Sequence, residues 1–321
     1  MGFIRNMATV IHKRQMVCRL CGASSRFQKI KGSFVFGGKA CDKFWECSAC
    51  KIVYLYPLPS EKQEEIFYRN EFEKYMAKRA GKDTRKGWLT PEDHIQINQT
   101  EVARRMLFLK QFLNRRKRLN ILEIGCSSGF LLFALRDLKH EVYGIEPSGI
   151  FTDFLRTNKV TFFSNADEAE QSGIKFDLII HYYVLEHIRK PADFLQAYMK
   201  LLSCGGRMVF EVPNVKDPLL SLYQVPAFDK FYWSIAHHWY FSPGSMSYVL
   251  NKQGYKHTFY FDQRYDLSNH IVWMLEGKPG GKGRYSDIFT PELENSYKQS
   301  LVKSGYCDTL GVILENVAVL I

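Results

Sequence analysis

The sequence predicts an α/β protein with a doubly wound, seven-stranded sheet, preceded by a small cysteine-rich module. Short apolar runs alternate with amphipathic segments from about residue 119 to residue 276, which is typical of parallel strands joined by helices. A loop of small residues, 125–129, follows the first of these strands, and a glutamate ends the second. Because ligands of such sheets bind beyond the carboxyl ends of the strands, we expect the functional site there.

The loop after the first strand has room for a ligand. Residues 121–124 form an apolar run too short for a buried helix, whereas residues 130–138 are apolar at helical spacing. The pattern Glu123-x-Gly125-x-x-x-Gly129 brings small residues to the start of that helix, where free N–H groups favour electronegative partners. An ordinary strand-turn-helix connection without a ligand would give the same local pattern.

Glu146 strengthens the prediction of a ligand. It follows the second strand, residues 141–145, and lies 21 residues after Gly125. At this position a nucleotide-binding sheet places the carboxylate that accepts hydrogen bonds from ribose hydroxyls. A dinucleotide site would have a second glycine where this chain has Ser127, because that glycine makes room for a pyrophosphate. The spacing therefore predicts a nucleoside-containing cofactor.

The later strands follow in the same rhythm. Asp167 comes after the third strand and Tyr182 lies at the carboxyl end of the fourth, so both belong to the same edge of the sheet as Gly125 and Glu146. Residues 119–276 are expected to form one domain. The strands after the second are expected at residues 160–163, 176–180, 207–212, 256–261 and 270–275.

Two further segments complete this half of the chain. Residues 215–241 are rich in aromatic side chains and interrupt the alternation after the fifth strand, where an insertion would roof a substrate pocket. Residues 277–321 are expected to be a linker rich in Gly and Lys followed by a helix at 291–304. The last ten residues are apolar enough for a buried strand or helix.

Two C-x-x-C knuckles lie near the N-terminus, at Cys18 and Cys21 and at Cys47 and Cys50. Each knuckle places two thiolates on one side of a tetrahedron, so the pair can hold a zinc ion with four sulfurs and no open coordination position. The zinc would therefore be structural, and residues 1–59 would form a zinc-ribbon-like module with strands at 33–36, 44–46 and 52–56. Four free thiols are the alternative. The remaining cysteines are a spare thiol, Cys41, and three expected packing residues: Cys126, Cys204 and Cys307.

Residues 60–118 connect this module to the sheet and are predicted to be helical. Ser60 is a suitable N-cap with Gln63 in the capping-box position, and the first helix extends to about Tyr75. A longer helix runs from Pro91 to about Leu113. It would either close over the cofactor or cover the sheet, and the sequence does not separate these roles.

Composition sets the broad class of the protein. Its 321 residues are 46% hydrophobic and 15% aromatic, which is typical of globular domains. No apolar run near the N-terminus suits a signal peptide or a membrane span, so we expect a cytoplasmic protein. The net charge of +11 suits nucleic acid, anionic lipid or a phosphorylated small substrate. The densest basic run, 115–118, ends a predicted helix, where cations are favourable, so nucleic acid is the less favoured partner.

Three features occur together: the cysteine knuckles, LEIGCSSGF at residues 122–130, and FDLIIHYYVLEHI at 176–188 with HHWYFSPGS at 237–245. In this combination the chain resembles bacterial class I S-adenosylmethionine (SAM) methyltransferases with an N-terminal zinc module, a group that includes nucleotide-sugar C-methyltransferases. The resemblance covers about residues 18–275. It implies the Rossmann-like fold of these enzymes, SAM as cofactor and a structural zinc ion.

The resemblance also implies a set of cofactor contacts. The loop residues would pack against the methionine part of SAM, Glu146 would bind the ribose, and Asp167 or its neighbours would hold the adenine. Glu123 of the loop pattern and Tyr182 at the end of the fourth strand are added to this set. The predicted cofactor-binding residues are therefore Glu123, Gly125, Cys126, Gly129, Glu146, Asp167 and Tyr182.

The catalytic residues are expected at His237 and His238. In the sugar C-methyltransferases a Glu-His pair before a Tyr-Phe-Ser motif supplies the base, and this chain has His-His at that place. The sulfonium is already an activated donor, so the enzyme must align the acceptor and deprotonate it. Neutral imidazole suits that task, which makes His238 the first candidate and His237 the second. The alternative is that the His237-His238 pair forms a hydrogen-bonded corner with a purely structural role. Of the other histidines, His181 is a candidate pocket residue and His187 is expected to be structural.

We therefore expect methyl transfer from SAM to a small acceptor, a sugar or nucleotide-linked sugar in glycan biosynthesis. Only residues 277–321 follow the expected seventh strand, where the sugar C-methyltransferases have a large domain, so O- and C-methylation both stay open. RNA methylation is the alternative, since zinc modules and positive charge occur in RNA-modifying enzymes. A binding module without activity is disfavoured by the intact glycine loop and Glu146. The sequence does not indicate the oligomeric state.

Overall fold

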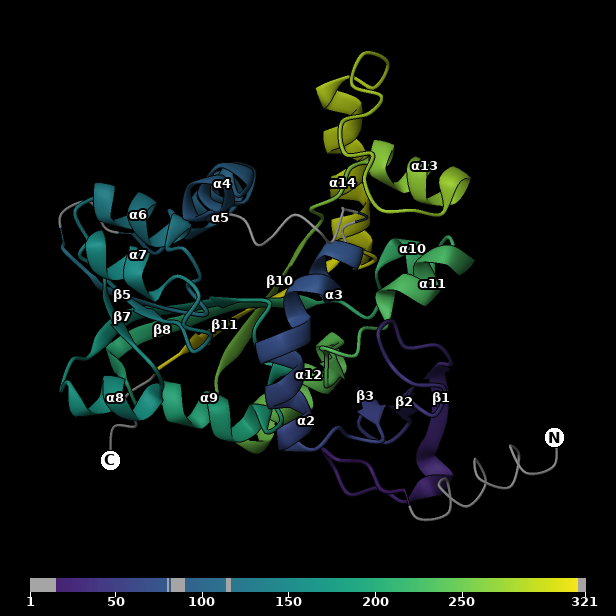
Figure 1. The fold of residues 1–321 in the computed structure, drawn as a ribbon, viewed down its shortest axis with the longest axis horizontal. Helices are drawn as coiled ribbons and strands as arrows, with labels where there is room; N and C mark the ends of the chain where they lie inside the picture. The colour runs from purple at the N-terminus through teal and green to yellow at the C-terminus, as the bar shows by residue number, and fades with distance from the viewer. Residues whose placement is uncertain (1–15, 80, 82–89, 114–116, 317–321) are drawn as a thin grey trace.

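A seven-stranded mixed sheet lies at the centre of the molecule, in the order β10-β11-β8-β7-β4-β5-β6 (Figure 1). The computed structural model describes residues 16–79, 81, 90–113 and 117–316. Strands β4 to β8 are parallel, whereas β11 pairs antiparallel with both β8 and β10. The strands are β4 (Asn120–Ile124), β5 (Glu141–Ile145), β6 (Thr161–Phe163), β7 (Phe176–Tyr182), β8 (Leu202–Pro213), β10 (His257–Asp262) and β11 (Thr309–Glu315).

The strand order reverses between β4 and β7. From β4 the chain continues outward through β5 to β6, and then returns to β7 on the other side of β4. The connections of these two neighbours leave in opposite directions and open a crevice at their carboxyl ends, where ligands of such sheets bind. The predicted doubly wound, seven-stranded Rossmann-like sheet is confirmed.

Helices cover both faces of the sheet, as Figure 1 shows. On one face, apolar side chains of α6 and α7 such as Leu131 and Leu155 are fully buried against β4 and β5. On the other face, Leu195 of α9 and Met246 of α12 are equally buried. Each such side chain stabilises the fold by about 1.5–3 kcal/mol. The covering helices are α5 (Gln99–Leu109), α6 (Phe130–Asp137), α7 (Thr152–Thr157), α8 (Ala166–Gln171), α9 (Pro191–Met199) and α12 (Pro243–Lys252).

The seventh strand is not where the sequence predicted it. The expected strand at 270–275 is wrong, because these residues belong to helix α13 (Leu267–Glu276), which Asp266 caps by accepting a hydrogen bond from the Asn269 N–H. Short apolar runs do not separate strand from buried helix. The seventh strand is β11, which the C-terminal segment supplies after helix α14 (Pro291–Ser304). The helix expected at 291–304 is confirmed, and residues 317–321 lie outside the described part.

The cysteine module is a four-stranded antiparallel sheet that borrows its last strand from the second half of the chain. The order is β1-β2-β3-β9, and β9 consists of Trp239 and Tyr240. The strand expected at 33–36 is wrong, because β1 precedes it. Residues 1–15 of the expected module lie outside the described part. The strands are β1 (Gln28–Gly32), β2 (Lys43–Cys47), β3 (Val53–Tyr56) and β9 (Trp239–Tyr240).

The helical connector leads from this module to the sheet. Ser60 forms the predicted capping box with Gln63, and the first helical stretch continues without a break to Arg79. The second helix is interrupted at Asn98, which separates α4 from α5. Residues 80, 82–89 and 114–116 of this connector, which include part of the basic run at 115–118, lie outside the described residues. The elements are α2 (Glu61–Ile66), a π-helical turn η2 (Phe67–Glu71), α3 (Phe72–Arg79) and α4 (Pro91–Ile97).

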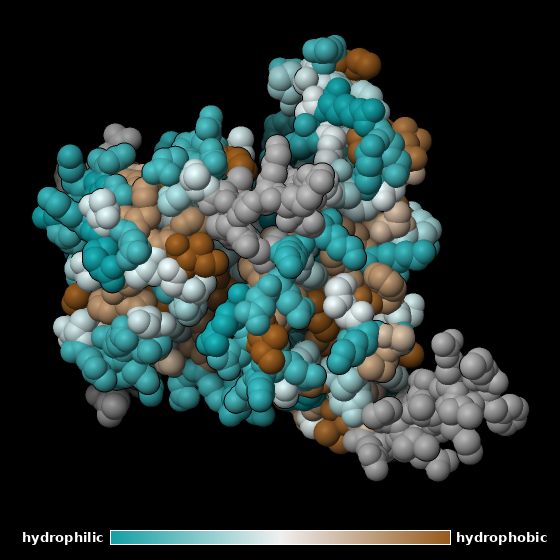
Figure 2. All heavy atoms as spheres, viewed as in Figure 1, coloured by the Kyte–Doolittle hydropathy of each residue, from teal (hydrophilic) through white to brown (hydrophobic). Residues whose placement is uncertain are grey.

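The aromatic insertion at 215–241, which we call the roof, folds into two short helices, α10 (Pro218–Ser221) and α11 (Pro226–Tyr232). Its apolar side chains share a core with the cysteine module, in which Phe44 stacks on Trp233 at 5.3 Å. None of the described helices is both long and apolar enough to cross a membrane. The face shown in Figure 2 is mostly hydrophilic, with separate hydrophobic spots.

Candidate active site

The carboxylate of Glu146 holds the loop that follows β4. Its Oε2 accepts a hydrogen bond from the Ser127 N–H at 2.8 Å, and its Oε1 accepts one from the Ser148 N–H at 2.9 Å. The loop turns through positive φ at Gly125 and Ser127. A side chain on Gly125 would come within 2.9 Å of Val184, so the turn requires glycine there. Glu146 thus joins the carboxyl ends of β4 and β5.

Cys126 and Glu123 lie behind this loop, inside the protein. The Cys126 thiol packs under Gly144, where an added side-chain carbon would lie 2.5 Å from the sulfur. Glu123 is 3% exposed, and its Oε2 has no hydrogen-bond partner among the described residues. Burial raises the pKa of Glu123 to about 8, and Glu146 adds to the shift while Arg105 opposes it. The carboxyl group is therefore mostly protonated near neutral pH.

Arg105 and Tyr182 complete a set of unpartnered polar groups beside the loop. The Arg105 guanidinium lies 4.0 Å over the Tyr182 ring, and it also acts electrostatically on Glu123. Arg105 Nε, the Tyr182 hydroxyl and Glu123 Oε2 are all buried and lack partners among the described residues. Each unpaired buried group is unfavourable by about 1–3 kcal/mol. A bound ligand that both donates and accepts hydrogen bonds would satisfy them.

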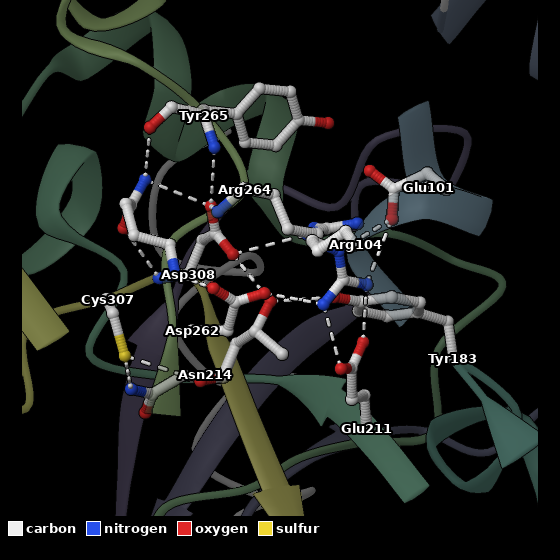
Figure 3. Close-up of polar contacts among 12 residues, drawn as sticks. Glu101, Arg104, Tyr183, Glu211, Asn214, Asp262, Arg264, Tyr265, Cys307 and Asp308 are labelled. Carbon is white, nitrogen blue, oxygen red and sulfur yellow. Dashed lines mark hydrogen bonds and ion pairs between the residues drawn. The ribbon is translucent and has the colours of Figure 1, made fainter. Parts of the chain in front are cut away.

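Helices α4 and α5 make different contacts in this region. His94 of α4 places Nδ1 2.9 Å from the Ser128 hydroxyl, so α4 contacts the loop. Arg104 of α5 makes a two-pronged ion pair with Glu211 at the end of β8, at 2.7 and 2.8 Å, so α5 is fixed over the sheet (Figure 3). Neither His94 nor Arg105 was predicted, because the sequence did not show which helix face meets the loop.

The remaining predicted cofactor residues lie at the same edge. Gly129 has a positive φ and immediately precedes α6. Asp167 is exposed in the first turn of α8, just after β6. The carboxyl ends of β4, β5, β6 and β7, with the loops that follow them, are called the cofactor edge below.

A cavity of about 470 Å³, the acceptor cavity, opens beyond the carboxyl ends of β7 and β8. It is lined by α3, the roof helices, the turn after β7 and residues near 264 and 280. Two adjacent tyrosines separate it from the cofactor edge. Tyr182 stacks with Arg105, whereas Tyr183 has a positive φ and carries Arg264 at 4.2 Å over its ring. One peptide unit therefore links the two sites.

Glu186, His187 and His237 form a polar cluster in the acceptor cavity. One ligand atom from each lies within 4.8 Å of the others. Both carboxylate oxygens of Glu186 are buried without partners among the described residues, and burial raises its pKa to about 8. Burial also lowers the pKa of His187 to about 4 and that of His237 well below its usual value. The cluster can exchange a proton with an acceptor, and its donor atoms would also suit a divalent cation.

The two predicted catalytic histidines face different cavities. His237 lines the acceptor cavity, whereas His238 lines a second cavity of about 420 Å³ together with Tyr68. His238 Nε2 lies 3.1 Å from Glu64 Oε1. Burial, reinforced by the charge of Arg19, lowers the pKa of His238 to about 3, so this contact involves a neutral imidazole. The His237 ring, and not the His238 ring, adjoins the Glu186 carboxyl group, whereas the His238 N–H donates to the Glu186 carbonyl oxygen at 2.7 Å.

His181 and His187 do not have the roles that the sequence predicted for them. His181 is fully buried, stacks on Phe210 at 4.5 Å and is not among the residues that line the acceptor cavity. Its expected role as a pocket residue is therefore wrong. His187, expected to be structural, lines the cavity, and its Nδ1 lies 2.8 Å from the Ala236 carbonyl oxygen.

The four knuckle cysteines come together in the ribbon. Their sulfur atoms all lie within 4.8 Å of one another, with Cys18–Cys50 and Cys21–Cys47 both at 3.7 Å. Sulfurs bound tetrahedrally at about 2.3 Å from zinc lie about 3.8 Å apart, so the geometry fits this metal. Among the other cysteines, Cys204 is exposed, so its expected packing role is wrong.

Comparison with known proteins decides the family. The family described as "Methyltransferase domain" matches residues 95–258, just over half of the chain. The chain belongs to this family. The matched region is a SAM-dependent methyltransferase domain, and it contains the loop and strand ends of the cofactor edge.

Several curated methyltransferases are similar to this one over part of their length. Ubiquinone biosynthesis O-methyltransferases from Ruegeria sp. (strain TM1040) and Roseobacter denitrificans are 24% identical over 173 residues and 30% identical over 112 residues. These matches cover 48% and 30% of this chain, and 66% and 42% of the relatives. A tRNA U34 carboxymethyltransferase from Idiomarina loihiensis is 27% identical over 169 residues, 48% of this chain and 51% of the relative. The chain thus spans between 42% and 66% of these relatives.

Solved structures of methyltransferases also align with the chain. A SAM-dependent methyltransferase from Archaeoglobus fulgidus has a TM-score of 0.48 at 14% identity, covering 75% of this chain and 97% of that one. The plantazolicin methyltransferase BpumL in complex with SAH has a TM-score of 0.45 at 15% identity, covering 80% and 98%.

The methyltransferase has groups that fit SAM at its cofactor edge. SAM presents an amino group, a carboxylate, ribose hydroxyls and an adenine ring. The unpartnered atoms of Glu123, Arg105 and Tyr182 include both acceptors and donors for such groups. The Glu146 oxygens each accept one backbone hydrogen bond, and a carboxylate oxygen can accept a further one.

Proposed function

We propose that this methyltransferase transfers the methyl group of SAM to a hydroxyl of a sugar or nucleotide-linked sugar bound in the acceptor cavity. The observation that carries the proposal is the Glu186–His237 pair, a buried carboxyl group beside a half-buried neutral imidazole that can accept a proton inside a cavity of about 470 Å³. This volume is in the range of small-molecule sites. Transfer to a sugar carbon is the variant of the same proposal in which this pair removes a C–H proton.

In the proposed site, bound SAM supplies an activated methyl group. Glu146 accepts hydrogen bonds from the ribose hydroxyls, and the loop of Gly125, Cys126 and Gly129 borders the methionine part. Asp167 lies on the adenine side. Because the Cys126 thiol packs under β5, its contribution comes from the backbone.

His237 is the proposed general base in place of the first candidate, His238. It lines the cavity beside Glu186, whereas His238 faces Glu64 in the second cavity. At neutral pH the lowered pKa leaves His237 as a free base. Glu186 stands within 4.8 Å and can share or relay the proton.

The four cysteines are proposed to hold a structural zinc ion, which would stabilise the strands that pack beside the segment carrying His237. β9 follows His238 directly and pairs with β3 of the ribbon, and the Leu55 N–H donates to the His238 carbonyl oxygen at 3.0 Å. Arg19, inside the first knuckle, lies 4.3 Å over the Trp239 ring. The module therefore fixes the segment that presents His237.

The distribution of charge favours a small acceptor over RNA. A basic basin of about 580 Å³ exists, but its lining residues include Lys117, Lys139 and Lys159, which precede β4, β5 and β6. It thus lies at the amino ends of these strands, opposite the cofactor edge. An RNA held there would not present a base to His237. Of the relatives, the ubiquinone biosynthesis enzymes are named as O-methyltransferases, which agrees with a hydroxyl acceptor.

The experiment is methyl transfer from labelled SAM to a panel of nucleotide sugars, free sugars and total tRNA. We expect a labelled sugar product with the wild-type protein and a strongly reduced amount with His237→Ala. Label in RNA and not in sugar, or equal sugar methylation by the variant, would reject the proposal.

A further inference from the structure

The glycine- and lysine-rich segment 277–283, GKPGGKG, is part of the acceptor cavity and not a plain linker. Pro279, Gly280 and Lys282 all line the cavity. Gly280 and Gly281 have positive φ, and a side chain on Gly281 would come within 2.4 Å of Val272. Glycine is therefore required for the path of this loop beside the cavity.

The loop offers unused hydrogen-bond donors. The N–H groups of Gly280, Gly281 and Lys282 have no acceptor among the described residues, and neither does the Lys282 ammonium group. Successive N–H groups in such a backbone form a concavity that binds anions. Asn269, 3% exposed, donates to the Gly280 carbonyl oxygen, and its own Oδ1 is buried without a partner. The Asn269 side chain thus holds the loop against the cavity wall, and its Oδ1 is an acceptor without a partner.

Arg264 supplies a second, independent cation at the same cavity. Figure 3 shows its guanidinium group between Asp308 and Tyr183. Only Nε is engaged, at 3.2 Å from Asp308 Oδ1, and the two terminal nitrogens have no acceptor among the described residues. Stacking on Tyr183 holds the planar group in place.

The balance of charge in the cavity favours an anion. Its lining cations are Arg79, Arg264 and Lys282, and its lining acids are Glu186, Asp217 and Asp308. Burial raises the pKa values of Glu186 and Asp217 to about 8, so both are mostly uncharged near neutral pH. Asp308, the third lining acid, already accepts hydrogen bonds from Arg264 Nε and from the N–H groups of residues 264 and 265.

We propose that Arg264, Lys282 and the 280–282 backbone bind a diphosphate group of the acceptor. This inference rests on the proposed function and specifies it, because the acceptor is then a nucleotide-linked sugar and not a free one. A diphosphate has enough oxygens to accept from the guanidinium, the ammonium and the loop N–H groups together, whereas a carboxylate has two. The sugar lies toward Glu186 and His237, and the diphosphate lies toward the loop.

The test is calorimetric binding of pyrophosphate and of UDP at fixed ionic strength, with the intact protein and SAH present. Arg264→Gln/Lys282→Gln should weaken both by about tenfold or more, because two charge-assisted contacts are lost. Lys139→Gln/Lys159→Gln is the matched control, since it removes two exposed cations from the basic basin, and it should change affinity less than twofold. Uridine and glucuronate should bind far more weakly than UDP.

Equal pyrophosphate affinity in the Arg264→Gln/Lys282→Gln protein and the wild type would overturn the inference, as would an equal loss in the control or equal binding of uridine and UDP. Asp308 keeps four other donors, from Gln263, from the Thr309 hydroxyl and from the N–H groups of 264 and 265, so Arg264→Gln should fold. If SAH binding shows that it does not, exposed Lys282 carries the test alone as Lys282→Glu. No methyl transfer is measured, so a failure of sugar methylation does not affect the result.

Discussion

The cofactor edge and the acceptor cavity share one peptide link at Tyr182 and Tyr183, yet they are built in different ways. Nearly every group at the cofactor edge follows a parallel strand between residues 120 and 182. The cavity takes its lining from α3, the turn after β7, the roof, the loop at 277–283 and Asp308. One site is local in the chain, and the other is assembled from segments more than 200 residues apart.

This difference separates what is general from what is particular in the enzyme. The cofactor edge depends on backbone geometry, such as positive φ at Gly125 and the two N–H groups held by Glu146. The acceptor cavity depends on side chains that meet only through tertiary packing, including a roof that shares its core with the ribbon. Changes to the ribbon or roof should therefore affect methyl transfer while leaving SAM binding intact.

Removal of the metal should have the largest effect. Cys18→Ser/Cys47→Ser, or treatment with a strong chelator, should abolish detectable methyl transfer because β3 loses the support that pairs it with β9 and His238. SAM affinity by calorimetry should stay within a few-fold of wild type. Elemental analysis should find one zinc per wild-type chain. Full activity without zinc, or parallel loss of SAM binding, would show that the two regions are not separable.

Substitution of the base should come next. His237→Ala should lower turnover by ~10²–10⁴-fold, the usual share of acid–base catalysis. Adjacent His238→Ala is the matched control and should have a much smaller effect, because this residue faces Glu64. If His238→Ala is the more damaging change and folding is intact, the base lies in the second cavity.

The pH profile tests the same pair. Burial raises the pKa of Glu186 to about 8, so its carboxyl is protonated below this pH and ionised above it. An anionic neighbour strengthens His237 as a base, so turnover should rise as the pH passes 8. His237 itself has a pKa lowered well below its usual value and should titrate only on the acid side. Glu186→Gln should remove the alkaline rise, and a profile unchanged by this variant would contradict the pairing.

Sequence reasoning succeeded where chemistry is fixed by local spacing. Gly125 and Glu146 lie at adjacent strand ends because each follows a short buried strand, and the knuckle thiols meet because C-x-x-C turns pair naturally. It failed at 270–275, where an apolar run forms α13 and the ribbon and roof cores decide the outcome. It also ranked His238 before His237, because the sequence does not show which cavity each of two adjacent residues faces.

Glu146→Ala should affect the cofactor edge and not the acceptor cavity. Loss of a charge-assisted contact to the ribose should weaken SAM binding by about 2–3 kcal/mol, and the loop also loses its anchor at the Ser127 N–H. Glu146→Gln keeps one carbonyl acceptor and should weaken binding less. Asp167→Ala, at an exposed position, is the control for a local change at the same edge. Unchanged calorimetric affinity in Glu146→Ala would remove this residue from the site.

The smallest expected effect comes from substituting two helix caps, one beside the acceptor cavity and one beside the cofactor edge. Ser60 caps α2, which leads into the α3 wall of the acceptor cavity, and Asn165 caps α8 beyond β6. Each alanine substitution should destabilise its helix by about 1 kcal/mol. Because a frayed α2 loosens only the acceptor wall, Ser60→Ala should raise the acceptor KM a few-fold and leave the SAM Kd unchanged. Asn165→Ala should raise the SAM Kd a few-fold and leave the acceptor KM unchanged. If either variant changes the KM and the Kd equally, the cofactor edge and the acceptor cavity respond as one unit.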